Sequence, residues 1–520
     1  AQKAITNPDL ANLVRKEQDA LRQIQAIQGA FLNAMAVPPA QQNQEIVSTL
    51  KERAAKLRQA RSALLDEIQN RFPKYTEFIT PQPITLGAVQ KYLRSHESIL
   101  LIIPTDENTF IWTIPSKGPV AFAISDLNRQ QLHYAVRKIR KAFDAKAKTF
   151  GEIPDYNFEL AFNLYDRLIE PVKDGWKNAR DLTVIVHGPL ALMPLSALPT
   201  KPIKLVADHA ELFSSYRRIP WLIREVSITR QPSVSAFVML RKLPTGDPDR
   251  IAFAGFGDPV YSLEQLAEEE VSNQKMKADG TNQQKNFQIR GIRLAEQGNL
   301  DNKNILSVQL TDLKRLPETA QEIKSIASAL KCVPDRDIFL RARASEGRVK
   351  CMDLSNRRII AFASHALVSG DLDGLNQPAI ALSTPQVTGE DDDGLLTMEE
   401  VMKLNLNTDW VLLSGCNSGA SYGRGAEVLS GLGQAFFYAG TRAILVSLWS
   451  VETTSAQLLT TGVFRNQQSD KSLSRARALQ QSILDLIDGP GLTDQSSGKI
   501  VASYAHPFFW APFIVVGDGR

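Results

Sequence analysis

Residues 409–449 read DWVLLSGCNSGASYGRGAEVLSGLGQAFFYAGTRAILVSLW and decide the fold. The stretch opens with an apolar run, Trp410 to Leu413, that is short enough for a buried strand. A helical pattern over 427–439 and a second apolar run over 443–448 follow, with a glycine at the expected helix end. This order predicts a strand–helix–strand unit. It places Cys416 just beyond the first strand, where parallel sheets carry their reactive groups.

A second stretch of the chain has the same design. Residues 357–365 read RRIIAFASH, an apolar run that ends in small residues and then in His365. A cysteine alone is weak evidence, because a free cysteine is usually a buried and inert hydrophobe. A histidine base must lie within hydrogen-bond reach of the thiol in space, and two adjacent parallel strands would provide that. His365 and Cys416 therefore predict a thiol nucleophile paired with a histidine base.

Composition limits the class of protein. A chain of 520 residues is too long for one core, and its hydrophobic content of 43% is typical of globular proteins. The net charge of +4 is too small to indicate nucleic acid or an acidic membrane surface as a partner. No apolar run approaches the roughly 20 residues that span a bilayer. Three cysteines form no disulfide framework, so we expect a reducing compartment, the cytoplasm.

We expect three domains. Residues 1–72 show an amphipathic helical pattern interrupted by two prolines, which predicts a helical hairpin. Residues 84–245 predict an α/β subdomain that contains no cysteine, so we interpret it as non-catalytic and its His187 as structural. Residues 250–520 predict a doubly wound, mostly parallel, six-stranded sheet flanked by helices. Its strands are expected to begin at Ile251, Ile338, Arg358, Trp410, Ala443 and Pro512.

Five motifs taken together resemble the CHAT domain family. They are SHAL (364–367), LSGCNSG (413–419), GAEVLSGLGQAFFYAG (425–440), SLWSVETTSAQLL (447–459) and HPFFWAPFIVVGDG (506–519). The resemblance covers most of the chain, from about Asn7 to the end. A CHAT domain is a caspase-like cysteine peptidase domain, of the group that includes separase and the gingipains. The resemblance therefore implies a caspase-like sheet and an endopeptidase.

The resemblance also implies roles for individual residues. His365 matches the general base of the family and Cys416 the nucleophile. The family binds the oxyanion through backbone N–H groups, which here would be those of Cys416 and Ala366. The usual signature has glycine where this chain has Ala366. Alanine keeps the N–H group, so the oxyanion hole survives if the backbone angles accept a Cβ.

Substrate-pocket residues are harder to assign. Gly415 would let a substrate backbone approach closely. Glu427 and Glu452 lie within the matching motifs, and either would suit a basic substrate side chain. The alternative is that each carboxylate stabilises the start of a helix, where acidic residues are common.

Two function classes stay open. The first is a regulated endopeptidase that cleaves a protein substrate and is controlled by a sensor or a repeat-containing partner. The second is a protein-interaction scaffold with the same fold and a dormant site. We expect no cofactor and no metal, because no CxxC, HExxH, GxGxxG or P-loop motif occurs and the acidic loop 390–393 does not match a calcium loop. The long polar segment 262–314 is interpreted as a solvated insertion, with substrate contact or activating cleavage as alternatives.

Overall fold

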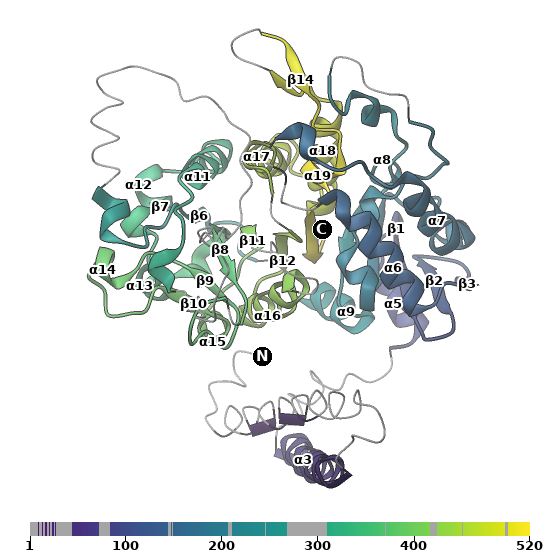
Figure 1. The fold of residues 1–520 in the computed structure, drawn as a ribbon, viewed down its shortest axis with the longest axis horizontal. Coiled ribbons are helices and arrows are strands. Elements are labelled where there is room, and N and C mark those ends of the chain that lie inside the picture. Colours follow the sequence, from purple (N-terminus) through teal and green to yellow (C-terminus); the bar gives the residue numbers. More distant parts are fainter. Residues whose placement is uncertain are drawn as a thin grey trace. The chain divides into compact units, whose positions relative to one another are not determined.

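The computed structural model describes the chain in two compact units, Ala1–Thr85 and Leu86–Arg520 (Figure 1). The described residues are 9, 13, 16, 17, 20, 23, 24, 27, 44–71, 84–143, 147, 149–205, 211–244, 246–267, 309–369, 371–416, 424–449, 451–493 and 498–520. Most of the predicted polar insertion lies outside them. Among the helices within these ranges, none has the length and hydrophobicity that crossing a bilayer requires.

The first unit is a helical hairpin, as predicted. Its second helix is α3 (Gln44–Arg71), and the described positions between residues 9 and 27 are also helical. Arg71 lies 2.8 Å from Asp9 and Arg61 lies 2.6 Å from Glu17, so the two helices run antiparallel. The apolar residues of the predicted stripe that are buried are Leu13, Ala20, Ile24, Ala54 and Ile68.

The described residues of the second unit begin with ten α-helices and β-strands that belong to the first predicted α/β subdomain. They are α5 (Leu86–Tyr92), β1 (Glu97–Pro104), β2 (Thr109–Pro115), β3 (Ala121–Ser125), α6 (Arg129–Arg140), α7 (Phe158–Leu168), β4 (Asp181–Val186), α8 (Leu222–Glu225), β5 (Ser227–Arg230) and α9 (Val234–Lys242). Ser233 caps the start of α9, because its hydroxyl accepts a hydrogen bond from the Ala236 N–H at 3.1 Å.

The second α/β part follows and contains all six predicted strands. Its elements are β6 (Ile251–Gly257), α11 (Glu318–Ala329), α12 (Pro334–Asp337), β7 (Ile338–Leu340), α13 (Glu346–Cys351), β8 (Arg357–Leu367), β9 (Ala379–Ala381), α14 (Pro385–Thr388), β10 (Leu395–Thr397), α15 (Met398–Lys403), β11 (Trp410–Cys416), α16 (Arg424–Ala439), β12 (Ala443–Ser447), α17 (Thr453–Ser469), α18 (Arg475–Asp488), β13 (Leu492–Thr493), β14 (Ile500–Ala502), α19 (Pro507–Trp510) and β15 (Phe513–Gly517). Residues 395–397 form the short strand β10, which pairs antiparallel with β9.

Both α/β parts contribute to one sheet of 13 strands. Its main path runs β10-β9-β8-β11-β12-β15-β5-β4-β1-β2-β3, and β6 pairs with β7 and β8. The centre of each part is parallel, with β6, β8, β11 and β12 in one group and β1, β4 and β5 in the other. The predicted mostly parallel sheet flanked by helices is confirmed.

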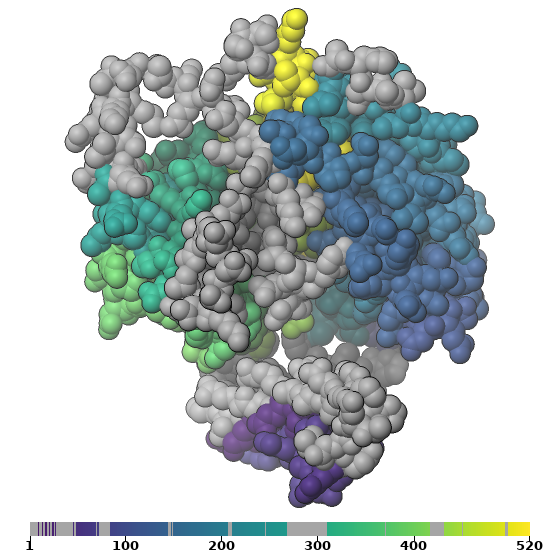
Figure 2. Space-filling view, viewed as in Figure 1, coloured from purple at the N-terminus to yellow at the C-terminus, as the bar shows by residue number. Residues whose placement is uncertain are grey.

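The last strand joins the two parts. The strand β15 lies in the interior of the sheet, where it pairs antiparallel with β12 on one side and parallel with β5 on the other. The strand β5 was not predicted, because its four residues, SITR, show no apolar run. Figure 2 shows residues of the first α/β part in blue on the right and residues of the second part in green on the left, with yellow C-terminal residues at the top.

The strand directions reverse across this junction. Since β12 and β15 are antiparallel while β15, β5 and β4 are parallel, β4 and β11 run in opposite directions. The carboxyl ends of the two parallel groups therefore face opposite rims of the sheet. The expected boundary between the two α/β subdomains, near residues 245–250, stays a prediction.

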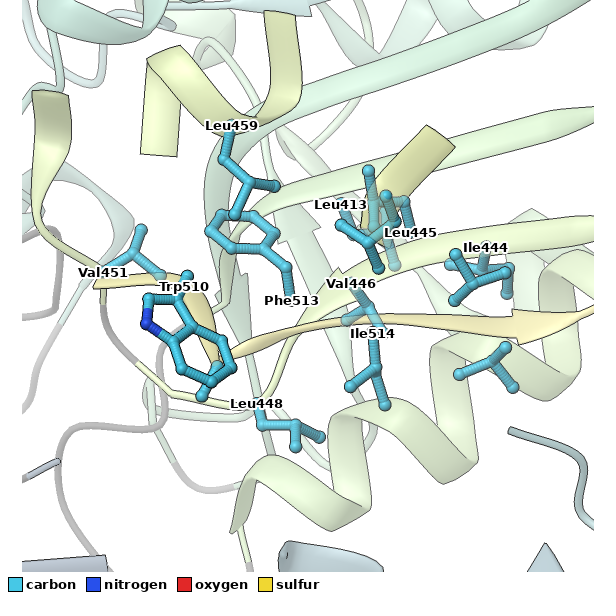
Figure 3. Close-up of a cluster of buried hydrophobic side chains, with 14 of the residues drawn as sticks. Leu413, Ile444, Leu445, Val446, Leu448, Val451, Leu459, Trp510, Phe513 and Ile514 are labelled. Carbon is cyan, nitrogen blue, oxygen red and sulfur yellow. The ribbon is translucent and has the colours of Figure 1, made fainter. Parts of the chain in front are cut away.

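Helices cover both faces of the sheet, and one buried core connects the two parts. Figure 1 shows α11, α17 and α18 on one side of the second part and α15 and α16 on the other. The core cluster extends from Leu100 in β1 to Val515 in β15 without a break. Close to the junction, Val446 of β12 lies beside Ile514, its register partner on the adjacent strand β15 (Figure 3). This packing fixes the strands whose ends carry the candidate site.

Candidate active site

The backbone brings the two predicted reactive residues to neighbouring strands. β8 and β11 are parallel and adjacent, with Trp410 opposite Ile359 and Ser414 opposite Ala363. Cys416 is then opposite Ala366, the residue directly after His365. Adjacent strands lie about 4.8 Å apart, so the backbones at the two positions lie close together at the carboxyl ends of the strands.

Gly415 makes this register possible. The register of β11 against β8 shifts between Ser414 and Cys416. Gly415 has a φ of +130°, and a Cβ there would collide with the carbonyl oxygen of Ser364. Only glycine tolerates both the backbone angle and the close approach. The structure thus gives Gly415 a role inside the protein, while the predicted contact with substrate stays a prediction.

Two of the predicted side chains lie outside the described residues. The structure describes the backbone of Cys416 but not its thiol, and it describes Glu427 only as a position in α16. The proposed roles of these side chains stay predictions.

The imidazole of His365 is tied at one nitrogen. The residue is only 1% exposed, and its Nε2 lies 2.7 Å from the backbone carbonyl oxygen of Lys314. Since a carbonyl oxygen only accepts, Nε2 must carry the hydrogen of this bond. Burial lowers the pKa of His365 and so favours the neutral ring, in which Nδ1 is the basic nitrogen.

The basic nitrogen of this ring has no hydrogen-bond partner in the part of the chain that the structure describes. Nδ1 of His365 is buried and unpaired among these residues. An unpaired buried acceptor is costly and is uncommon in folded proteins. Here the unpaired atom is the nitrogen that a general base needs, and it belongs to the strand beside Cys416.

Tyr261 contacts two neighbouring residues of β8, His365 and Ser364. The ring of Tyr261 packs against the imidazole of His365 at a centroid distance of 5.9 Å. The hydroxyl of Ser364 donates to the carbonyl of Ala381, so the 3.0 Å bond between Tyr261 and Ser364 must use the tyrosine proton. Burial raises the pKa of Tyr261, which keeps the tyrosine protonated as this donor.

Ala366 fits the position where the family pattern has glycine. The residue is 3% exposed and lies in β8, between Cys416 of β11 and Ile380 of β9. It is not among the described residues with a positive φ, so its Cβ causes no backbone strain. The departure from the family signature therefore does not disturb the strand. Its role and that of Cys416 in binding an oxyanion stay predictions.

Glu452 has the helix-start role that was the alternative at the sequence level. Its carboxylate accepts hydrogen bonds from the N–H groups of Thr454, at 2.9 Å, and Ser455, at 2.7 Å. It is therefore the N-cap of α17. The side chain is 2% exposed, and burial raises the pKa of its carboxyl group. A role as a pocket residue stays a prediction without support from this geometry.

The remaining histidines of interest differ in their surroundings. His187 is exposed at the end of β4, on the rim opposite to His365. His506 is fully buried, and its Nδ1 accepts a hydrogen bond from the Phe508 N–H at 3.1 Å. Burial lowers the pKa of His506 to about 3. His506 thus caps α19 as a neutral ring.

One group of described side chains has the spacing of metal ligands. His96, Glu97 and Asp181 place ligand atoms within 4.8 Å of one another. Their atoms are used within the protein, because Asp181 lies 3.1 Å from His96 and Glu97 lies 3.0 Å from Arg241. The guanidinium of Arg241 would repel a cation bound between these three side chains. In the acidic loop, the Asp392 carboxylate accepts a hydrogen bond from the backbone N–H of residue 347, and Asp393 accepts one from residue 395, at 2.8 and 2.9 Å.

Sequence reasoning missed the residues that hold the imidazole. Lys314 acts through its backbone carbonyl, which leaves no signature in a sequence. Tyr261, Asp258 and Arg315 come from segments next to β6 and α11. Asp258 directly follows a predicted strand, and this position at a strand end was the one available signal.

These features define a class: mixed α/β proteins that place a histidine and a cysteine at the carboxyl ends of neighbouring parallel strands. The model of the CHAT domain matches residues 159–518. The chain belongs to the CHAT domain family.

Other comparisons add little. The comparison with curated proteins gave no match. Two crystal structures of the Saccharomyces cerevisiae separase–securin complex align with 96% of this chain, at identities of 11% and 13% and TM-scores of 0.40 and 0.30. The chain spans only 37% and 27% of the length of these two chains.

Proposed function

We propose that this protein is a cysteine endopeptidase in which Cys416 is the nucleophile and His365 the general base. The observation that carries the proposal is the parallel pairing of β8 with β11, which sets Cys416 opposite Ala366 and thus next to His365. The state of the imidazole supports it. Nε2 is hydrogen-bonded to the Lys314 carbonyl, and the basic Nδ1 has no partner among the described residues.

The reaction follows from these groups. The thiol of Cys416 gives its proton to Nδ1 of His365 as the sulfur attacks a peptide carbonyl. Backbone N–H groups of Cys416 and Ala366 would donate to the oxyanion. The C–N bond then breaks, the leaving amine takes the proton from His365, and a thioester remains. Water attacks the thioester with His365 again accepting a proton, which releases the acid and restores the thiol.

A comparison of cysteine variants tests the proposal. Purified wild-type protein and Cys416→Ala are incubated with a proteome, and new peptide N-termini are identified by mass spectrometry. Wild-type protein should generate a set of termini that Cys416→Ala does not. Cys351→Ala, which removes an exposed thiol elsewhere, should generate the wild-type set. Termini that persist in Cys416→Ala would exclude Cys416 as the nucleophile.

A dormant scaffold is the second candidate, and the burial of His365 favours it. A residue that is 1% exposed cannot meet a substrate without some rearrangement. This candidate predicts identical termini for wild-type protein and Cys416→Ala. It also predicts that both proteins capture the same partner.

The remaining parts of the proposal concern context. We propose a protein substrate and a regulatory protein or repeat-containing partner that opens the site, because an unrestrained thiol peptidase would endanger its own cell. We place the protein in the cytoplasm, since a thiol nucleophile and the lack of a disulfide framework suit a reducing compartment. Separate detection of the protein in cell fractions tests this location.

A further inference from the structure

We propose that the ion pair between Asp258 and Arg315 positions the Lys314 carbonyl and thereby holds His365 with its hydrogen on Nε2 and its lone pair on Nδ1. Asp258 and Arg315 are then positioning residues of the candidate site. This inference rests on the proposed function, because it explains how the general base is kept in its working form.

The ion pair has the geometry of a fixed clamp. Arg315 donates from Nε to one carboxylate oxygen of Asp258 and from Nη2 to the other, each at 2.7 Å. The Asp258 side chain is 2% exposed and that of Arg315 is 15% exposed. A two-pronged pair of this kind defines direction as well as distance, and burial strengthens it relative to a surface pair.

The carboxylate end of the clamp is anchored beside the site. Asp258 directly follows β6, which is parallel to β8 with Gly257 opposite Ala363. The Asp258 N–H donates to the hydroxyl of Thr319 at 2.8 Å, and its carbonyl accepts from the Arg341 N–H at 3.1 Å. Its φ of +52° is uncommon for a residue with a side chain. This conformation turns the chain at the strand end that neighbours His365.

The guanidinium end fixes the peptide that touches the imidazole. The Lys314 carbonyl and the Arg315 N–H belong to one peptide unit, so anchoring the Arg315 side chain restrains that carbonyl. On the other side, Gln265 donates from Nε2 to the Leu313 carbonyl at 2.8 Å. The side chains of Leu313 and Leu316 are buried, so residues 313–316 are also held in place by apolar packing.

The chemistry of the ring explains why this restraint matters. A neutral imidazole carries its single hydrogen on either nitrogen, and the partner of the other nitrogen decides which form prevails. With Lys314 in place, Nε2 has an acceptor and Nδ1 stays basic. If the carbonyl moves away, the form with hydrogen on Nδ1 becomes comparable in energy, and that form cannot accept the thiol proton at Nδ1.

The experiment measures the ring directly. Full-length protein is labelled with ring-15N histidine, and the nitrogen shifts of His365 are assigned by comparison with His365→Gln. Wild-type protein should show the Nε2–H form alone. Arg315→Gln and Asp258→Asn should show a mixture, and the rate of Cys416 alkylation by iodoacetamide should fall about tenfold in both, with Cys351 as the internal reference.

Two further variants separate positioning from general stability. Arg250→Gln breaks a comparable pair, 3.0 Å from Asp409, at the opposite ends of β6 and β11. It should lower the melting temperature without changing the His365 shifts. Arg315→Lys keeps the positive charge but loses the two parallel hydrogen bonds of the guanidinium. Its proportion of the Nε2–H form of His365 should lie between those of wild-type protein and Arg315→Gln. This variant replaces Arg315→Gln in the test if Arg315→Gln does not fold.

The outcomes are distinct. Unchanged His365 shifts in Arg315→Gln, or equal changes in Arg250→Gln, would overturn the inference. Faster alkylation of Cys416 in Arg315→Gln would overturn it too, because the clamp would then restrain the site rather than prepare it. If wild-type protein shows the Nε2–H form but cleaves nothing, the proposed function fails while the positioning claim stands.

Discussion

The two α/β parts share one sheet, but different residues lie at the carboxyl ends of their parallel strands. In the second part, β8 carries the buried His365 two residues before its end, and the adjacent strand β11 ends in Cys416. In the first part, the exposed His187 directly follows β4, and the neighbouring strand β5 ends in Arg230, which donates to the carbonyls of Ala191 and Met193. The topology is thus compatible with a site at either rim, and the residues at the strand ends decide where one is built.

The burial of the two histidines explains this difference in physical terms. The ring of His365 is shielded from water and its Nε2 is hydrogen-bonded to the Lys314 carbonyl. The nitrogen that carries the hydrogen is therefore defined. His187 remains in contact with solvent, which can satisfy either ring nitrogen. A strand-end histidine is therefore a useful predictor only together with the groups that surround it.

The largest effect should come from exchanging the two histidines for alanine. His365→Ala removes the proposed general base and should lower kcat/KM about 100- to 10,000-fold on a substrate found by the cleavage experiment. His187→Ala should leave kcat/KM unchanged. Equal losses in both variants would mean that His365 acts through folding rather than chemistry.

The shared core should make the two parts unfold together. Leu445→Ala in β12 and Leu100→Ala in β1 each remove a fully buried side chain from one continuous cluster. Each should lower the free energy of unfolding by about 2–5 kcal/mol. Urea unfolding followed by circular dichroism and by tryptophan fluorescence should show one transition of the α/β unit that both variants shift. Two transitions, each shifted by one variant, would support separate subdomains.

Replacing glycine by alanine should lower the free energy of unfolding by different amounts at the ends of β11 and β4. Gly415→Ala combines a φ of +130° with a collision against Ser364 and should cost about 3 kcal/mol of stability. Gly188→Ala, after β4, has a φ of +60° and open space around it, so it should cost only about 1 kcal/mol. Urea unfolding measures both. A larger cost at Gly188 would contradict the account of the β11 register.

The smallest predicted effect is a pH dependence carried by His506. Its pKa is lowered from 6.5 to about 3 by burial, so the folded state holds the neutral ring and the unfolded state binds the proton first. This contribution is complete above pH 6.5 and is lost as pH falls toward 3. At pH 5 the loss is about 2 kcal/mol relative to pH 7.

Two variants isolate this contribution. His506→Asn should flatten that part of the stability profile between pH 7 and pH 5, whereas His187→Gln should leave the profile as it is. A profile of His506→Asn parallel to that of the wild-type protein would show that other groups carry the dependence.

Much of the fold followed from local patterns. Apolar runs bounded by small residues located β8, β11 and β12, and a glycine located the end of α16. The same patterns named His365 and Cys416 as residues at strand ends. Such predictions succeed because a buried strand needs continuous apolar side chains and a helix end favours glycine, and both requirements are written in neighbouring residues.

Only the tertiary structure decided how the segments pair. The interior place of β15 and the reversed direction of the first part depend on hydrogen bonds between strands hundreds of residues apart. The tie between His365 and Lys314 depends on a backbone carbonyl, a group that every residue carries. The sequence by itself determined which residues reach the ends of strands, and the packing of distant segments determined which partners they meet there.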